Sequence, residues 1–185
     1  MLLIMGNPAL PALAPWANFY SIVGSAAGAL IGLQFVAMTL VAQAKAVGSM
    51  RVIRAFGTPT VVHFCAALLI SAVMSAPWEA LSHLGVCLGA SGITGFAYSL
   101  IVVRHARKQT GYAADAGDWL SYIVFPMIAY AGLAAEGILL FQNVRFCLFL
   151  IAASSLLFLL IGIRNAWDAV THIAVHRQRP NEPKE

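Results

Sequence analysis

Near the start of the chain lies the segment WANFYSIVGSAAGALIGLQFVAMTLVAQ, residues 16–43, which contains no charged side chain. A helix needs about 20 apolar residues to cross a hydrocarbon core about 30 Å thick, and this segment exceeds that length. Four further segments meet the same requirement, and they cover residues 56–76, 80–103, 119–141 and 146–176, the last with a polar cytoplasmic extension. The sequence therefore predicts an all-α integral membrane protein, a bundle of five transmembrane helices.

The composition supports a lipid-facing surface. Of the 185 residues, 61% are hydrophobic and only 10% are charged, whereas a soluble domain carries about 25% charged residues. The length suits one transmembrane domain, residues 16–176, with an extracytoplasmic lead-in at residues 1–15. We expect the polar tail, residues 177–185, to be disordered.

The positions of the basic residues predict the orientation. They gather in three regions, which contain Lys45, Arg51 and Arg54, then Arg104, Arg107 and Lys108, then Arg177, Arg179 and Lys184. Five helices bring all three regions to one side, so the positive-inside rule places the N-terminus outside and the C-terminus in the cytoplasm. Trp16 and Tyr20 are then expected at the outer boundary. We expect a bacterial inner membrane, and no nucleic-acid partner, because the net charge of +4 forms no basic face with interleaved aromatics.

Two stripes of glycine predict close helix contacts. Gly24, Gly28 and Gly32 follow one another at four-residue spacing, as do Gly85 and Gly89. Small residues on one helix face allow backbones to approach closely, and this approach drives helix association in lipid. The contacts can be formed within one chain, between subunits or, for a pore, beside an open path.

Glu136 is the most informative polar residue, because it lies one to two turns inside the outer end of residues 119–141. An ionised acid costs about 2.5–3.5 kcal/mol at the centre of a membrane helix. Arg145, with Glu79 and His83, is predicted at the same outer rim and is a candidate ion-pair partner. The sequence leaves two interpretations of equal weight: a structural ion pair, or a site that attracts an ion or binds a proton.

Two further polar residues, His63 and Gln34, lie within predicted spans. A histidine in this position favours a hydrogen-bonded contact between helices over a ligand site. The amide of Gln34 can bond across helices or line a water-filled path.

At the cytoplasmic end of the last helix, Arg164, Asp168, His172 and His176 recur every four residues, so neighbours share one helix face. The pattern favours a solvated extension over a metal site, and a pH-responsive gate is a further alternative. Cys65, Cys87 and Cys147 lack CxxC spacing and are expected to be free thiols. We expect no enzymatic activity, metal or cofactor.

These features predict a small channel or pore in the lipid bilayer that conducts ions or small solutes as a homo-oligomer. Gln34, His63 and Glu136 would line or gate the path, and the four residues from Arg164 to His176 would form its cytoplasmic mouth. The alternative is a non-conducting membrane subunit or modulator whose glycine stripes bind another membrane protein.

Overall fold

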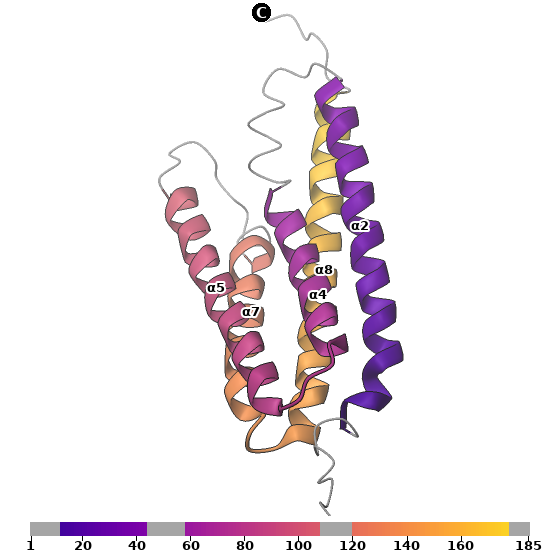
Figure 1. Ribbon diagram of the computed structural model, residues 1–185. Coiled ribbons are helices and arrows are strands. Elements are labelled where there is room, and N and C mark those ends of the chain that lie inside the picture. The colour runs from indigo at the N-terminus through magenta and orange to yellow at the C-terminus, as the bar shows by residue number, and fades with distance from the viewer. Residues whose placement is uncertain (1–11, 44–57, 108–119, 178–185) are drawn as a thin grey trace, which may run out of the picture.

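The structure is a computed structural model that describes residues 12–43, 58–107 and 120–177 (Figure 1). Its helices are α2 (Ala17–Gln43), preceded by a 3-10 turn (Ala14–Trp16), α4 (Thr58–Ser75), α5 (Leu81–Arg107), α7 (Phe125–Leu139), preceded by a π-helical turn (Leu120–Val124), and α8 (Val144–Arg177). Within these ranges, five helical segments are long and apolar enough to cross a membrane, if α7 is counted with its π-helical turn. The prediction of five such helices is confirmed.

The helices run alternately up and down in one bundle (Figure 1). We call one end the hairpin end, because it contains the links from α4 to α5 and from α7 to α8 together with the start of α2. The opposite, open end contains the last turns of α2, α5 and α8. The principal contacts are α5 with α7, α7 with α8, α8 with α4, and α4 with α2. Although α4 and α5 are consecutive, they touch only slightly, so α7 and α8 connect α5 to the rest of the bundle.

Both links at the hairpin end are fixed by side-chain hydrogen bonds. Trp78 donates from Nε1 to the carbonyl oxygen of Val73 over 2.6 Å, which folds the chain back as α4 ends. Asn143 accepts a hydrogen bond through Oδ1 from the backbone N–H of Phe146 over 3.1 Å, as expected of a residue that caps the start of a helix. Both links are therefore tight turns.

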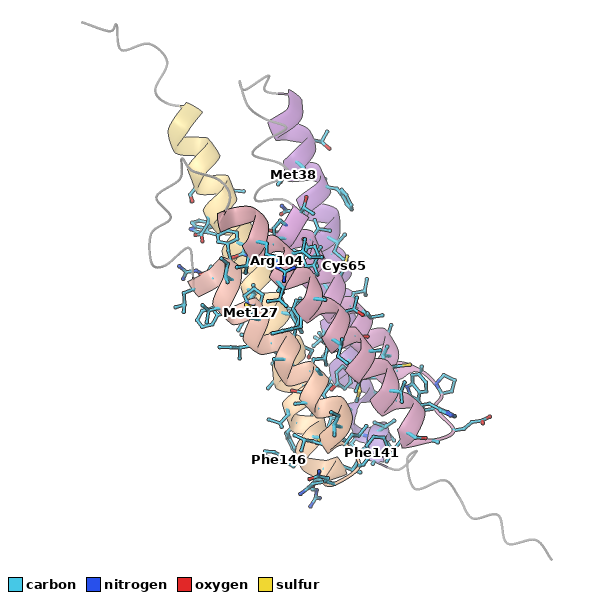
Figure 2. The ribbon with its side chains drawn as sticks, turned by 90° about the vertical axis from the view of Figure 1, so that its left-hand side faces the viewer. Met38, Cys65, Arg104, Met127, Phe141 and Phe146 are labelled. Atoms are coloured by element: carbon cyan, nitrogen blue, oxygen red, sulfur yellow. The ribbon has the colours of Figure 1, made fainter. Side chains whose placement is uncertain are left out.

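The bundle has an apolar core and an apolar outer surface. The largest wholly buried apolar side chains come from every α-helix and include Tyr20, Phe64, Leu84, Leu133 and Phe158. On the outer surface Leu33 is 64% exposed, Ile138 68% and Leu160 62%. Phe141 and Phe146 also point outward at the hairpin end, and Arg104 lies towards the open end of α5 (Figure 2). An outer surface of this kind suits lipid and would be unfavourable in water.

The helix boundaries lie within two residues of the prediction, if α7 is counted with its π-helical turn, except at the end of α5. α5 was predicted to end at residue 103, where the apolar run ends. It continues to Arg107, because the residues after that run still form regular helical turns. The chain before α7 is wound as a π-helix over Leu120–Val124 and becomes α-helical at Phe125. The predicted lead-in over residues 1–11, the basic residues Lys45, Arg51, Arg54 and Lys108, and residues 178–185 of the tail lie outside the described residues.

Candidate functional site

Glu136 lies in the last turn of α7, and its side chain is only 4% exposed. Ser154 of α8 donates a hydrogen bond from Oγ to Oε1 of Glu136 over 2.7 Å. The other carboxyl oxygen, Oε2, is also buried and has no hydrogen-bond partner among the residues that the structure describes. The bundle therefore encloses a carboxyl group of which only one oxygen is hydrogen-bonded to a described residue.

Two more buried hydroxyl groups lie in the same half of the bundle. Tyr20 of α2 is 1% exposed and Ser71 of α4 is 3% exposed, and neither hydroxyl oxygen finds a partner within the described ranges. Gly24 lies against Ser71, because a Cβ atom at that glycine would be 3.1 Å from Cβ of Ser71. We call Tyr20, Ser71, Glu136 and Ser154 the hairpin-end cluster, which draws one residue from each of four helices.

Arg145, the candidate ion-pair partner, does not reach Glu136. It is exposed in the first turn of α8, whereas Ser154 lies about 13 Å further along the same helix at 1.5 Å per residue. In the described part of the chain the ion pair is Arg164 with Asp168, at 3.8 Å. Glu79 and His83 are also exposed. The expected outer rim of four charged or titratable groups is therefore not assembled around Glu136, which lies too deep to meet them.

His63 forms a second polar layer nearer the middle of the bundle. It is 2% exposed on α4, and its Nδ1 lies 3.4 Å from the hydroxyl oxygen of Tyr130 on α7. Phe158 of α8 stacks on the His63 ring, with 6.3 Å between the ring centroids, and packs against Tyr130 at 4.6 Å. This arrangement is the contact between helices that the sequence favoured, and it joins three of them.

A third polar layer lies near the open end, around Asn165 of α8. Asn165 is fully buried, and neither Oδ1 nor Nδ2 of its amide has a hydrogen-bond partner within the described ranges. Its backbone carbonyl oxygen accepts a hydrogen bond from the Tyr122 hydroxyl over 3.3 Å. Tyr122 lies in the π-helical turn, a local winding that is frequent at functional sites. None of the residues in this layer was a predicted site residue.

Gln34 lies on the other side of α8 from these layers. Its side chain is 5% exposed and lines an apolar groove of about 260 Å³ together with Leu30, Phe64, Ile163 and Trp167. The residues that line the groove come from α2, α4 and α8, and they include neither His63 nor Glu136. Two of the three polar residues predicted to line a path, His63 and Glu136, lie in the buried polar layers. The third, Gln34, lies in the groove.

At the expected cytoplasmic mouth, Arg164 and Asp168 form an i,i+4 ion pair at 3.8 Å. The helix continues through residues 172 and 176, but the side chains of His172 and His176 lie outside what the structure describes. Among the side chains that are described, no group of three or more His, Cys, Asp or Glu residues could hold a metal ion.

The glycines divide into packed and open positions. Gly24 lies against Ser71, Gly85 lies against the backbone of α7, and Gly89 lies within ordinary contact of it. A Cβ atom at Gly28 or Gly32 would meet nothing within 4 Å. The second half of the α2 stripe therefore contacts no other helix among the described residues.

Several of the buried polar residues could not be identified from the sequence. Tyr20 was expected at the outer boundary, but in the first turns of α2 its side chain points into the core. Ser154 interrupts the most apolar of the five spans, which is the one signal that could have identified it. Tyr130 lies among apolar neighbours without a motif, and Asn165 lies between Arg164 and Asp168, which drew attention to the charged residues instead.

A scan against protein-family models and searches of curated proteins and solved structures found no match. The three buried polar layers, and the carboxyl group of Glu136 above all, are therefore the basis for a function.

Proposed function

We propose that this protein is a small membrane channel that conducts a cation through the interior of its helix bundle, with Glu136 as the group that attracts the ion. The observation that carries the proposal is the Glu136 carboxyl group, which is 4% exposed and has one oxygen without a partner among the described residues. An ionisable side chain inside a membrane is a candidate functional group by default, because its insertion costs free energy.

The surroundings of Glu136 favour a cation over a structural role. A structural acid inside a membrane pairs with a basic side chain or with several hydrogen-bond donors. Glu136 has one donor, Ser154, and no described basic side chain in an ion pair with it. A cation that passes through the bundle would supply the missing positive charge.

The buried polar layers form a discontinuous path along α7 and α8. The layer of His63 and Tyr130 lies about 9 Å from Glu136 along α7, and Asn165 lies about 16 Å from Ser154 along α8, at 1.5 Å per residue. Leu133, which is 1% exposed, lies between the first two layers. We propose that it acts as an apolar constriction that opens when ions pass, since such constrictions close a channel by excluding water.

We place the hairpin end outside and the open end in the cytoplasm. Arg104 and Arg164 lie towards the open end, as the positive-inside rule would require of a cytoplasmic face. In this orientation a cation from outside would meet the hairpin-end cluster first.

The proposal is tested by flux into liposomes. Purified protein is reconstituted with a trapped pH indicator or a trapped Na⁺ indicator, and a gradient of the ion is imposed. We expect a faster response than in empty liposomes, and a loss of about tenfold in Glu136→Gln for each 1.4 kcal/mol of cation attraction removed. Glu79→Gln is the matched control, because Glu79 is an exposed acid at the same end.

The experiment can also refute the proposal. Wild-type protein that moves neither ion above the empty-liposome rate would exclude conduction. Flux that is equal in wild-type and Glu136→Gln, with equal helix content by circular dichroism, would remove Glu136 from the path.

The open glycines favour a second candidate function, a non-conducting membrane subunit or modulator that binds another membrane protein. Gly28 and Gly32 lie on an exposed face of α2, where a Cβ atom would meet nothing. Small residues on such a face allow a second helix to approach closely. The purified chain distinguishes the candidates: ion flux in liposomes that contain this chain alone fits the channel, and a chain that is unstable alone and moves no ion fits the subunit.

A further inference from the structure

A groove lies at the hairpin end of the bundle, between the chain that enters α2 and the start of α8 (Figure 1). Its volume is about 590 Å³, and a typical ligand pocket has about 300–1,000 Å³. The residues that line it include Pro15, Trp16, Phe19, Arg145, Leu148 and Phe149. We call it the Arg145 groove. We infer that it binds one acidic phospholipid of the surrounding bilayer, with the phosphate at Arg145 and one acyl chain against Trp16 and Phe149.

The walls of the Arg145 groove are apolar and largely aromatic. Trp16 and Phe149 meet edge to face, with 4.8 Å between their ring centroids, and Phe19 meets Trp16 in the same way at 5.9 Å. Leu148 is 3% exposed and lies at the base of the groove, whereas Phe149 is 63% exposed. Tryptophan is enriched where the acyl chains of a membrane meet the lipid headgroups. The groove therefore suits the part of an acyl chain that lies next to the headgroup.

The charge at the rim of the groove is positive and is not balanced by a described acid. Arg145 is exposed in the first turn of α8, and the ion pair that the described side chains form is the one between Arg164 and Asp168. The first turn of α8 contains no acidic residue. A helix N-terminus carries a partial positive charge, so a cationic side chain there is unfavourable. A bound anion would offset both positive charges.

The position of the charge relative to the apolar wall selects a lipid over a free anion. Arg145 and Phe149 are four residues apart, so they share one face of α8 and are separated by about 6 Å along its axis. A phospholipid has the same order, a phosphate followed by a hydrocarbon chain. Basic pockets between membrane helices bind acidic headgroups, and a guanidinium group donates two parallel hydrogen bonds to a phosphate. A zwitterionic lipid would fill the groove but brings a cation of its own, so we expect an acidic one.

Native mass spectrometry tests the site in the intact protein. The purified full chain is freed of bound lipid by detergent exchange. It is then titrated with phosphatidylglycerol, or with phosphatidylcholine of the same acyl chains, and the lipid molecules that remain on each chain are counted. We expect one phosphatidylglycerol per chain at a concentration several-fold below the one that phosphatidylcholine requires. Glycerol phosphate, which is the headgroup without acyl chains, should not compete.

Two variants identify the two parts of the site, and each has a matched control. Arg145→Gln should raise the dissociation constant of phosphatidylglycerol about tenfold and remove its advantage over phosphatidylcholine. Arg104→Gln, at an exposed arginine towards the open end, should not (Figure 2). Phe149→Ala should weaken both lipids several-fold. Phe146→Ala should weaken neither, because Phe146 is 58% exposed on the same helix but does not line the groove. All four side chains are exposed, so we expect each variant to keep the wild-type helix content by circular dichroism.

The outcomes decide what occupies the groove. Equal binding of the two lipids, or an unchanged affinity for phosphatidylglycerol in Arg145→Gln, would overturn the proposal. Glycerol phosphate that competes as well as the whole lipid would reduce the groove to an anion site. A lipid-free dimer that becomes a monomer in Phe149→Ala would assign the groove to a second copy of the chain. None of these results depends on whether the protein conducts an ion, so the lipid site and the proposed channel can fail separately.

Discussion

Gly137 offers the most direct test of how the bundle is held together. A Cβ atom there would lie 2.6 Å from the carbonyl oxygen of Gly85 and 2.6 Å from the backbone nitrogen of Gly89. Both atoms belong to the backbone, so they can move only if α5 moves as a whole. Overpacking of this kind costs about 1–3 kcal/mol, and two backbone contacts place Gly137→Ala near the upper value. The better helix propensity of alanine returns about 1 kcal/mol, which leaves a net loss of about 2 kcal/mol.

The matched control is Gly28→Ala, the same substitution in another membrane helix at a position where a Cβ atom meets nothing within 4 Å. It should leave the free energy of unfolding unchanged or raise it by up to about 1 kcal/mol. Both variants are unfolded chemically in mild detergent, with helix content followed by circular dichroism. If Gly137→Ala is as stable as Gly28→Ala, the backbone contact between α5 and α7 is refuted.

Three other substitutions test the polar layers. Asn165→Leu removes two unpartnered buried polar atoms, so it should stabilise the protein by about 1–3 kcal/mol in chemical unfolding while lowering flux in liposomes; a less stable variant would show that the amide is bonded. Leu133→Ala should cost about 2–5 kcal/mol of stability and raise the flux, whereas an unchanged flux in folded protein would exclude Leu133 as the constriction. Tyr130→Phe removes the 3.4 Å contact with His63 and should cost about 0.5–1.5 kcal/mol by the same unfolding measurement; an unchanged stability would show that this contact is not a hydrogen bond.

The parts of the fold that depend on single helices could be predicted from the sequence. Length and hydrophobicity locate each of the five segments, because the bilayer imposes the same requirement on every one of them. The Gly85 and Gly89 stripe also predicted a close contact, since only small residues allow backbones to meet. The sequence could not tell which helix lies opposite, and the partner proved to be α7, through Gly137.

The candidate site depends on how the helices are aligned with one another, and the sequence does not encode that alignment locally. The distance of Glu136 from the end of α7 suggested Arg145 at the rim, but the side chain that reaches it is Ser154, about two and a half turns deeper along α8. Tyr20 illustrates the same limit. Its place in the sequence is typical of a boundary aromatic, and only the packing of α2 against its neighbours turns its side chain inward.

The two kinds of helix contact in this bundle suggest where an ion could enter with little rearrangement. α5 and α7 meet through backbone atoms at Gly85 and Gly137, and such a contact cannot open unless whole helices separate. α4 and α7, in contrast, meet through the side chains of His63 and Tyr130. Side chains change rotamer far more readily than packed helices separate. An ion held by Glu136 could therefore pass between α4 and α7 after side-chain rotation alone, and the contact of α5 with α7 would remain intact.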